Sequence, residues 1–211
     1  MTVASSSQPQ TQQQDPHTVV RMGGWLFRRR SWLPLPIVLA LVFLPAPSFT
    51  SPFLVWGGVA LVASGELLRL WAVRHIGVVS RTRSERLGPL VASGPFARLR
   101  NPLYVGNIGL WVGFVASAGL VWVIPPIALL LAFEYHAIVR WEERLLEERL
   151  GDTYREYAAR VPRWRPLTSP VSRNPQVSSR TFSWPDTLFS ERGTLLAIAA
   201  GYLLLWYKSQ I

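Results

Sequence analysis

An uncharged run from Pro102 to Phe133 constrains how this chain can fold. As one helix, its 32 residues would measure about 48 Å, whereas the hydrocarbon core of a bilayer is about 30 Å thick. The run therefore predicts two membrane crossings, with a turn near Gly119 to Pro126 and a second helix that continues to about Val139. Such a hairpin returns the polar residues before and after it to the same face of the membrane.

Three further apolar runs extend this pattern. Ser31 to Pro52 predicts a first span at about 33–49, and Phe53 to Val73 a second one that carries Glu66 and Arg69. Gly193 to Tyr207 is short for a span. It either crosses the membrane, lies in the interface or packs against the other helices. The expected fold is all-α: a transmembrane helical bundle of four spans with a candidate fifth.

Four regions follow from these runs. Residues 1–30 are expected to be a disordered basic tail, residues 31–75 the first two transmembrane helices, and 76–166 a core with a loop, the hairpin and cytoplasmic helices. Residues 167–211 are expected to be a Pro/Ser linker followed by a short apolar helix. Within the core, apolar residues at helical spacing predict a helix from Trp141 to Leu150. A capping box, Thr153 to Glu156, then opens a second helix that ends at Pro162.

The net charge of +10 comes almost entirely from arginine, since Lys208 is the only lysine. Arginines flank the apolar runs, while the two opposite turns, 48–52 and 118–126, carry no charge. This distribution favours membrane orientation over a nucleic-acid partner. It predicts a protein of the cytoplasmic (inner) membrane, with the N-terminus, the 74–101 loop and the 140–190 region in the cytoplasm. No cysteine is present and the histidines are not spaced as ligands, so no metal site is expected.

One ordered set of short motifs frames the hairpin. Gly94-Pro95-Phe96 and Arg100-Asn-Pro-Leu-Tyr-Val-Gly106 precede it; Glu142-Glu143, Gly151-x-x-Tyr154-x-x-Tyr157 and Val161-Pro162 follow it. Taken singly, each has an ordinary interpretation, such as a helix opened by Pro102 or a solvated pair of glutamates. Taken together, across about residues 88–166, they resemble the isoprenylcysteine carboxyl methyltransferase-like family of integral membrane methyltransferases.

The resemblance implies an enzyme that uses S-adenosyl-L-methionine, bound in a pocket at the cytoplasmic end of the bundle. It implies a lipophilic or lipid-anchored acceptor, with a prenylcysteine-like carboxylate favoured. One glutamate would touch the cofactor while the other positions an arginine, because adjacent helical residues point about 100° apart. Carried over to this chain, the catalytic residues are Arg100 and Tyr104, and the cofactor-binding residues are Gly94, Pro95, Asn101, Pro102, Tyr104, Gly106, Glu142 and Glu143.

Asn101 departs from the family, which most often has histidine there. An asparagine donates and accepts hydrogen bonds as a neutral imidazole does, but it does not titrate near neutral pH. Methyl transfer to a carboxylate needs alignment and a dry site rather than a base. We therefore interpret Asn101 as a binding residue.

Glu66 and Arg69 lie at i and i+3 inside the second span, where ionisable groups are costly and often functional. We expect them to bind substrate: Arg69 would hold an anionic head group and Glu66 an amine. The alternative is a salt bridge near the interface. Three other functions stay open: a sterol-reductase-like NADPH-dependent oxidoreductase, a phospholipid N-methyltransferase, and a membrane protein without enzymatic activity.

Overall fold

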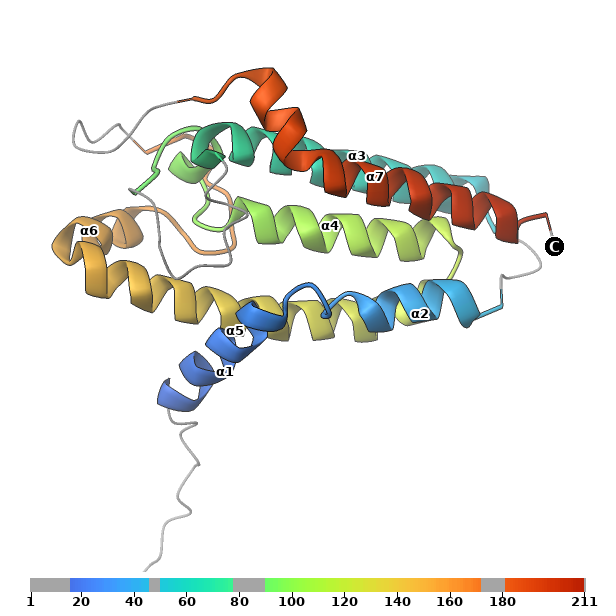
Figure 1. Ribbon diagram of the computed structural model, residues 1–211, viewed down its shortest axis with the longest axis horizontal. Helices are drawn as coiled ribbons and strands as arrows, with labels where there is room; N and C mark the ends of the chain where they lie inside the picture. The colour runs from blue at the N-terminus through green and yellow to red at the C-terminus, as the bar shows by residue number, and fades with distance from the viewer. Residues whose placement is uncertain (1–15, 46–49, 78–89, 172–180, 211) are drawn as a thin grey trace, which may run out of the picture.

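The computed structural model describes residues 16–45, 50–77, 90–171 and 181–210, and it contains helices and no strand within them (Figure 1). Helices α3, α4, α5 and α7 run along the molecule, while α1 leaves them at an angle and α6 lies at one end. In chain order the elements are α1 (Pro16–Arg29), α2 (Leu35–Phe43), α3 (Pro52–Ile76), η2 (Gly94–Ala97), α4 (Pro102–Ser117), η3 (Val121–Val123), α5 (Ile124–Leu150), α6 (Asp152–Arg160) and α7 (Trp184–Lys208).

In the part of the chain that the structure describes, three helices are long and apolar enough to cross a membrane: Pro52–Ile76, Val121–Leu150 and Trp184–Lys208. Helix α4 has 16 residues, about 24 Å, which is short of a full crossing. The expected span at 33–49 is wrong as a single helix, because α2 has only nine residues. Leu44 adopts an extended conformation immediately before Pro45, as residues that precede proline tend to do. Three helices of the described residues are thus candidate spans, and the expected four spans are not confirmed.

The hairpin forms where it was expected, with a turn between α4 and α5 at residues 118–123. Helix α5 does not end near Val139, however: it continues unbroken to Leu150 and includes the helix expected to begin at Trp141. No proline or glycine lies between Val139 and Gly151, and Gly151 has a positive φ of 53° that suits a helix end. Helix α6 starts at Asp152, and no side chain caps it, so the expected capping box is absent.

Helix α7 begins at Trp184, nine residues before the expected start at Gly193. Ser183 caps it by accepting a hydrogen bond from the backbone N–H of Asp186 at 3.2 Å. At its far end, Lys208 donates to the carbonyl oxygens of Leu41 at 2.6 Å and Leu44 at 2.7 Å. The only lysine of the chain therefore neutralises the negative end of α2 and ties α7 to it.

The expected disordered tail is wrong for residues 16–29, which form α1; residues 1–15 lie outside the described residues. The helix packs on α5 through two glycines. A Cβ on Gly23 would lie 2.0 Å from the carbonyl oxygen of Ala137, and one on Gly24 would lie 2.8 Å from the indole nitrogen of Trp141. The absence of these side chains lets α1 lie directly against the helix that carries Glu142.

Glycines also bring α3 and α4 together. A Cβ on Gly65 would lie 2.7 Å from the carbonyl oxygen of Gly106, and one on Gly113 would lie 2.7 Å from that of Gly58. Close backbone approach of this kind is typical of helix pairs in membranes, where apolar burial does not drive association. The start of α4 is therefore fixed relative to α3.

We predict that Gly58→Ala destabilises the protein and that Gly57→Ala does not. A Cβ on Gly58 would lie 2.4 Å from Ser117 Oγ and 2.6 Å from the Gly113 carbonyl oxygen, whereas one on Gly57 meets nothing within 4 Å. Overpacking of this kind costs about 1–3 kcal/mol. Thermal unfolding of both variants in detergent tests the prediction, and equal melting temperatures would contradict it.

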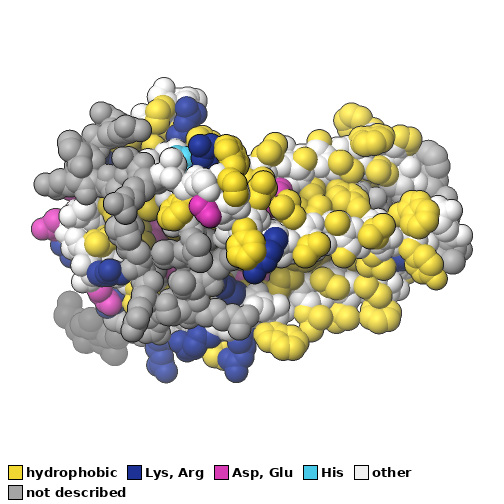
Figure 2. All heavy atoms as spheres, turned by 45° about the horizontal axis from the view of Figure 1, so that its top comes forward, with side chains coloured by type: hydrophobic (Ala, Val, Ile, Leu, Met, Phe, Trp, Pro, Cys, Tyr) yellow, Lys and Arg dark blue, Asp and Glu magenta, His cyan; other side chains and the backbone are white. Residues whose placement is uncertain are grey.

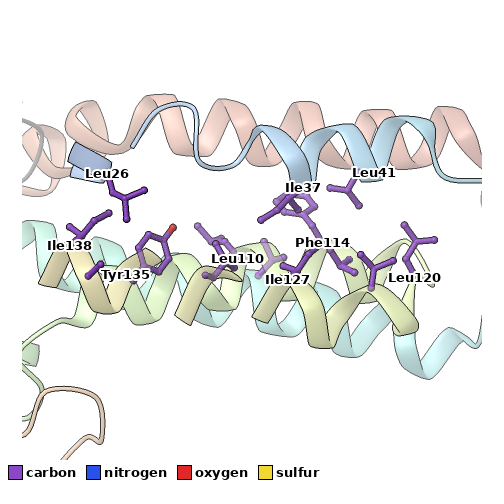
Figure 3. Close-up of a cluster of buried hydrophobic side chains, with 14 of the residues drawn as sticks. Leu26, Ile37, Leu41, Leu110, Phe114, Leu120, Ile127, Tyr135 and Ile138 are labelled. Carbon is purple, nitrogen blue, oxygen red and sulfur yellow. The ribbon is translucent and has the colours of Figure 1, made fainter. Parts of the chain in front are cut away.

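The apolar core lies between α1, α2, α4 and α5. Figure 3 shows Leu26, Ile37 and Leu41 facing Tyr135, Ile127 and Phe114 across this core. In Figure 2, charged side chains gather at one end of the visible face, and hydrophobic side chains cover the rest. This division agrees with an integral membrane protein whose polar end carries the sequence motifs.

Candidate functional site

The segment that leads into α4 is hydrogen-bonded to the chain that follows α6. Arg100 donates its backbone N–H to the Pro162 carbonyl at 3.0 Å, and the Tyr157 hydroxyl donates to the Phe96 carbonyl at 2.9 Å. Burial raises the pKa of Tyr157 above its usual range, so the hydroxyl stays protonated and remains a donor. These bonds join motifs that lie about sixty residues apart in the sequence.

Glu143 sits between two arginines. Arg163 donates to both of its carboxylate oxygens, from Nε at 3.0 and 2.9 Å and from Nη2 at 2.5 Å, and Arg100 Nη1 lies 2.9 Å from Oε1. The Glu143 side chain is 11% exposed and that of Arg100 14%. Neighbouring Tyr154 has its pKa raised to about 12, mainly by burial and further by the charge of Glu143. Glu143 therefore holds the motif segments together.

Glu142 points to a different neighbour. Its Oε1 accepts a hydrogen bond from the Tyr104 hydroxyl at 2.9 Å. The Tyr104 ring lies 5.0 Å from that of Tyr135. The positive charge of Arg30, just after α1, acts on both Glu142 and Tyr104. In the sequence, Arg30 belongs to the basic cluster that precedes the first apolar run, and no motif places it beside the glutamate pair.

Asn101 occupies the N-cap position of α4, but its side chain does not cap the helix. Its amide instead donates from Nδ2 to the Arg163 carbonyl at 3.3 Å. The first turn of α4 thus presents backbone N–H groups without a side-chain cap. Arg100 lies next to this turn, and its Nε is buried without a hydrogen-bond partner among the described residues.

The remaining motif residues have packing contacts. Pro95 and Pro102 are almost fully buried. A Cβ on Gly106 would lie 2.6 Å from Arg69 Cγ, so this glycine faces α3. Gly94 has a φ of 59°, and a Cβ there would lie 2.4 Å from the His75 ring. Gly94 also lines a cavity of about 410 Å³ together with Trp71, His75, Ala92, Ser93, Ala97, Arg98, Pro170, Val171 and Thr181.

Arg69 lies at the centre of a buried polar cluster. Its Nε is 3.3 Å from Glu66 Oε2, and its Nη2 is 2.5 Å from Glu191 Oε2 and 3.2 Å from Thr194 Oγ1. Its Nη1 donates to Asn107. The expected Glu66–Arg69 pair exists, but sequence spacing gave no sign that α7 supplies a second carboxylate.

Two groups stand out among the expected site residues. Arg100, Asn101, Tyr104, Glu142 and Glu143 meet where α4, α5 and the 157–171 segment come together. Gly106, Glu66 and Arg69 lie at the contact of α3 with α4. The assignment of any of these residues to cofactor or substrate stays a prediction.

Comparisons with known proteins identify the region that contains the motifs. Residues 53–153 match the family model described as phospholipid methyltransferase. The chain is 32% identical over 122 residues to the cobalt-zinc-cadmium resistance protein CzcN of Cupriavidus metallidurans, covering 58% of this chain and 53% of that protein. It is 33% identical over 112 residues to the nickel-cobalt-cadmium resistance protein NccN of Alcaligenes xylosoxydans xylosoxydans, covering 53% of this chain and 48% of that protein.

The chain spans about half the length of these curated relatives. No solved structure matches it significantly. Although both relatives are named for metal resistance, the described residues contain no group of three or more histidines and acidic side chains that would hold a metal ion.

The family match extends from α3 to the start of α6, and so includes Arg100, Tyr104, Glu142 and Glu143. The expected resemblance is thereby confirmed: residues 53–153 match the phospholipid methyltransferase family, which belongs to the isoprenylcysteine carboxyl methyltransferase-like superfamily of membrane methyltransferases.

Proposed function

We propose that the protein transfers a methyl group from S-adenosyl-L-methionine to a lipophilic or lipid-anchored acceptor. The observation that carries the proposal is that the matched segment brings Arg100, Tyr104 and Glu142 together at the start of α4. These residues come from the two ends of the hairpin.

The residues present fit the cofactor. The uncapped first turn of α4 offers backbone N–H groups to a carboxylate, and the unpartnered Nε of Arg100 offers a further donor beside it. Glu142 offers a carboxylate to an ammonium or to ribose hydroxyls. When bound, the cofactor would supply a methyl group on a positively charged sulfur.

Each residue then has a separable task. Glu143 keeps Arg100 and Arg163 in place by neutralising them. Tyr104 orients Glu142 through its hydrogen bond. Asn101 leaves the first turn of α4 open by bonding to the Arg163 carbonyl. The Tyr104 and Tyr135 rings pack against each other beside Glu142, so apolar surface borders the site.

The acceptor has two candidate head groups. The resemblance proposes a prenylcysteine-like carboxylate, which would use Arg69 as its anchor. In the structure Arg69 already contacts Glu66 and Glu191, and the matched family is described as acting on phospholipids. Both observations favour an amine head group, as in phospholipid N-methylation. The distribution of arginines further supports a site that faces the cytoplasm of the inner membrane.

We predict that Glu142→Gln weakens cofactor binding about 5- to 150-fold, because a charge-assisted hydrogen bond contributes about 1–3 kcal/mol. Tyr104→Phe should weaken it less. Isothermal titration of the detergent-solubilised protein with S-adenosyl-L-methionine measures both effects, and Glu148→Gln, an exposed glutamate on the same helix, is the control. Binding of NADPH instead of S-adenosyl-L-methionine would transfer the assignment to the oxidoreductase.

A further inference from the structure

One buried carboxylate has no role in the site described above. Glu134, on α5, is 7% exposed, and its Oε2 has no hydrogen-bond partner among the described residues. No arginine, lysine or histidine in the described part of the chain pairs with it. The other buried glutamates described, Glu66, Glu143 and Glu191, each contact an arginine.

Glu134 faces the interior of the bundle. Leu131 and Ile138, at i−3 and i+4 on the same helical face, are 1% and 0% exposed. Figure 3 shows Ile138 and Tyr135 within the apolar core that separates α5 from α1 and α2. An ionised carboxylate in such a place costs several kcal/mol unless a cation joins it. Packing does not require this charge, which indicates a role with a bound molecule.

The position of Glu134 relates it to the proposed methyl-transfer site. It lies eight residues before Glu142 on the same helix, a rise of about 12 Å. Its neighbour Tyr135 hydrogen-bonds to Asn107 and contacts the Tyr104 ring at 5.0 Å. The side chains of Glu142, Tyr104 and Tyr135 thus follow one another towards Glu134, and a cofactor held at Glu142 would extend past the two tyrosines to an acceptor head group at Glu134.

We propose that Glu134 is the proton acceptor for an amine substrate. This inference rests on the proposed function and narrows its acceptor class to a lipid amine. An ammonium group has no lone pair, so it must lose a proton before it can attack a methyl group. The Glu134 carboxylate takes that proton, which leaves a neutral amine and a neutral carboxylic acid.

The remaining bonds balance without a further reactant. The amine lone pair forms the N–C bond as the S–C bond breaks, and the electron pair of the S–C bond stays on sulfur. The methylated nitrogen carries the positive charge away. In apolar surroundings the neutral pair of acid and amine costs less than separated ions do, so the burial of Glu134 favours the proton transfer.

The test uses full-length protein in vesicles with methyl-labelled S-adenosyl-L-methionine and two lipid acceptors. One is phosphatidylethanolamine, whose amine is protonated at about pH 7. The other is an analogue with a trifluoroethylamine head group, which is neutral at that pH. Glu134→Gln should lower methylation of the first about 100-fold or more, and methylation of the second by less than tenfold, with cofactor affinity within twofold of wild type. The exposed Glu148→Gln is the matched control.

Glu134→Asp keeps a carboxylate. The ratio of its methylation rates on the two lipid acceptors should therefore stay near the wild-type ratio, even where its total activity is lower. Three results would overturn the assignment: a wild-type rate of Glu134→Gln on phosphatidylethanolamine, an equal loss on both acceptors, or a wild-type protein that binds the cofactor but methylates neither amine. A wild-type protein that does not bind the cofactor would instead remove the proposed function itself.

Discussion

Replacing Glu143 with alanine should lower the free energy of unfolding by about 3–5 kcal/mol, the usual cost of removing one partner from a buried ion pair. The substitution leaves Arg100 and Arg163 side by side without their shared carboxylate. It should also release the 157–171 segment from the start of α4. Denaturant unfolding in detergent measures the loss of stability, and proteolysis near Arg163 measures the release.

The adjacent glutamate is the control for this prediction. Glu142→Ala removes a single hydrogen bond from Tyr104 and should cost about 1 kcal/mol of stability, while its effect on cofactor binding is large. Equal stability of the two variants would show that the Arg100–Glu143–Arg163 cluster does not hold the motif segments together.

Arg69→Ala should also cost about 3–5 kcal/mol, because it removes the guanidinium that Glu66 and Glu191 both contact. Helix α7 should loosen from α3, since Glu191 and Thr194 lose the same partner. Exposed Arg192, on the same helix as Glu191, is the matched control. Unfolding in detergent measures the cost, and cross-linking between α3 and α7 measures the loosening.

This prediction also separates two roles for Arg69. If Arg69 binds an anionic acceptor, as the sequence suggested, its loss should raise the acceptor KM while stability stays unchanged. Unchanged stability together with a raised KM would therefore contradict the structural role inferred from its contacts.

The sequence predicted the helical hairpin and the meeting of its two polar ends because both follow from length and charge. A 32-residue apolar run has few ways to fit a bilayer, and the end of α6 before Pro162 follows from proline chemistry. The short length of α2 was not predicted because the apolar composition of residues 31–52 favours a full span. The prolines at both ends of this run instead limit the helix to nine residues. Helix α1 was not predicted because the polar composition of the first seventeen residues indicates disorder, whereas Gly23 and Gly24 permit packing on α5.

The candidate site was predicted as a set of residues but not as a geometry. Sequence order alone does not say which of two adjacent glutamates pairs with arginine, and the structure places Arg100 and Arg163 on Glu143. No local pattern encodes the contacts that distant helices contribute. Glu191 pairs with Arg69, and the charge of Arg30 acts on Glu142, only because of how the helices pack. Glu134 likewise gave no signal, because its burial appears only once α5 is placed against its neighbours.

The most direct test of the account is transfer of label from methyl-labelled S-adenosyl-L-methionine to a lipid by purified protein in vesicles. We predict that label enters the lipid fraction with wild-type protein and with Glu148→Gln, and that Glu142→Gln reduces this transfer. Absence of transfer to any amine or carboxylate lipid, together with no measurable binding of S-adenosyl-L-methionine, would contradict the assignment of this chain as a membrane methyltransferase.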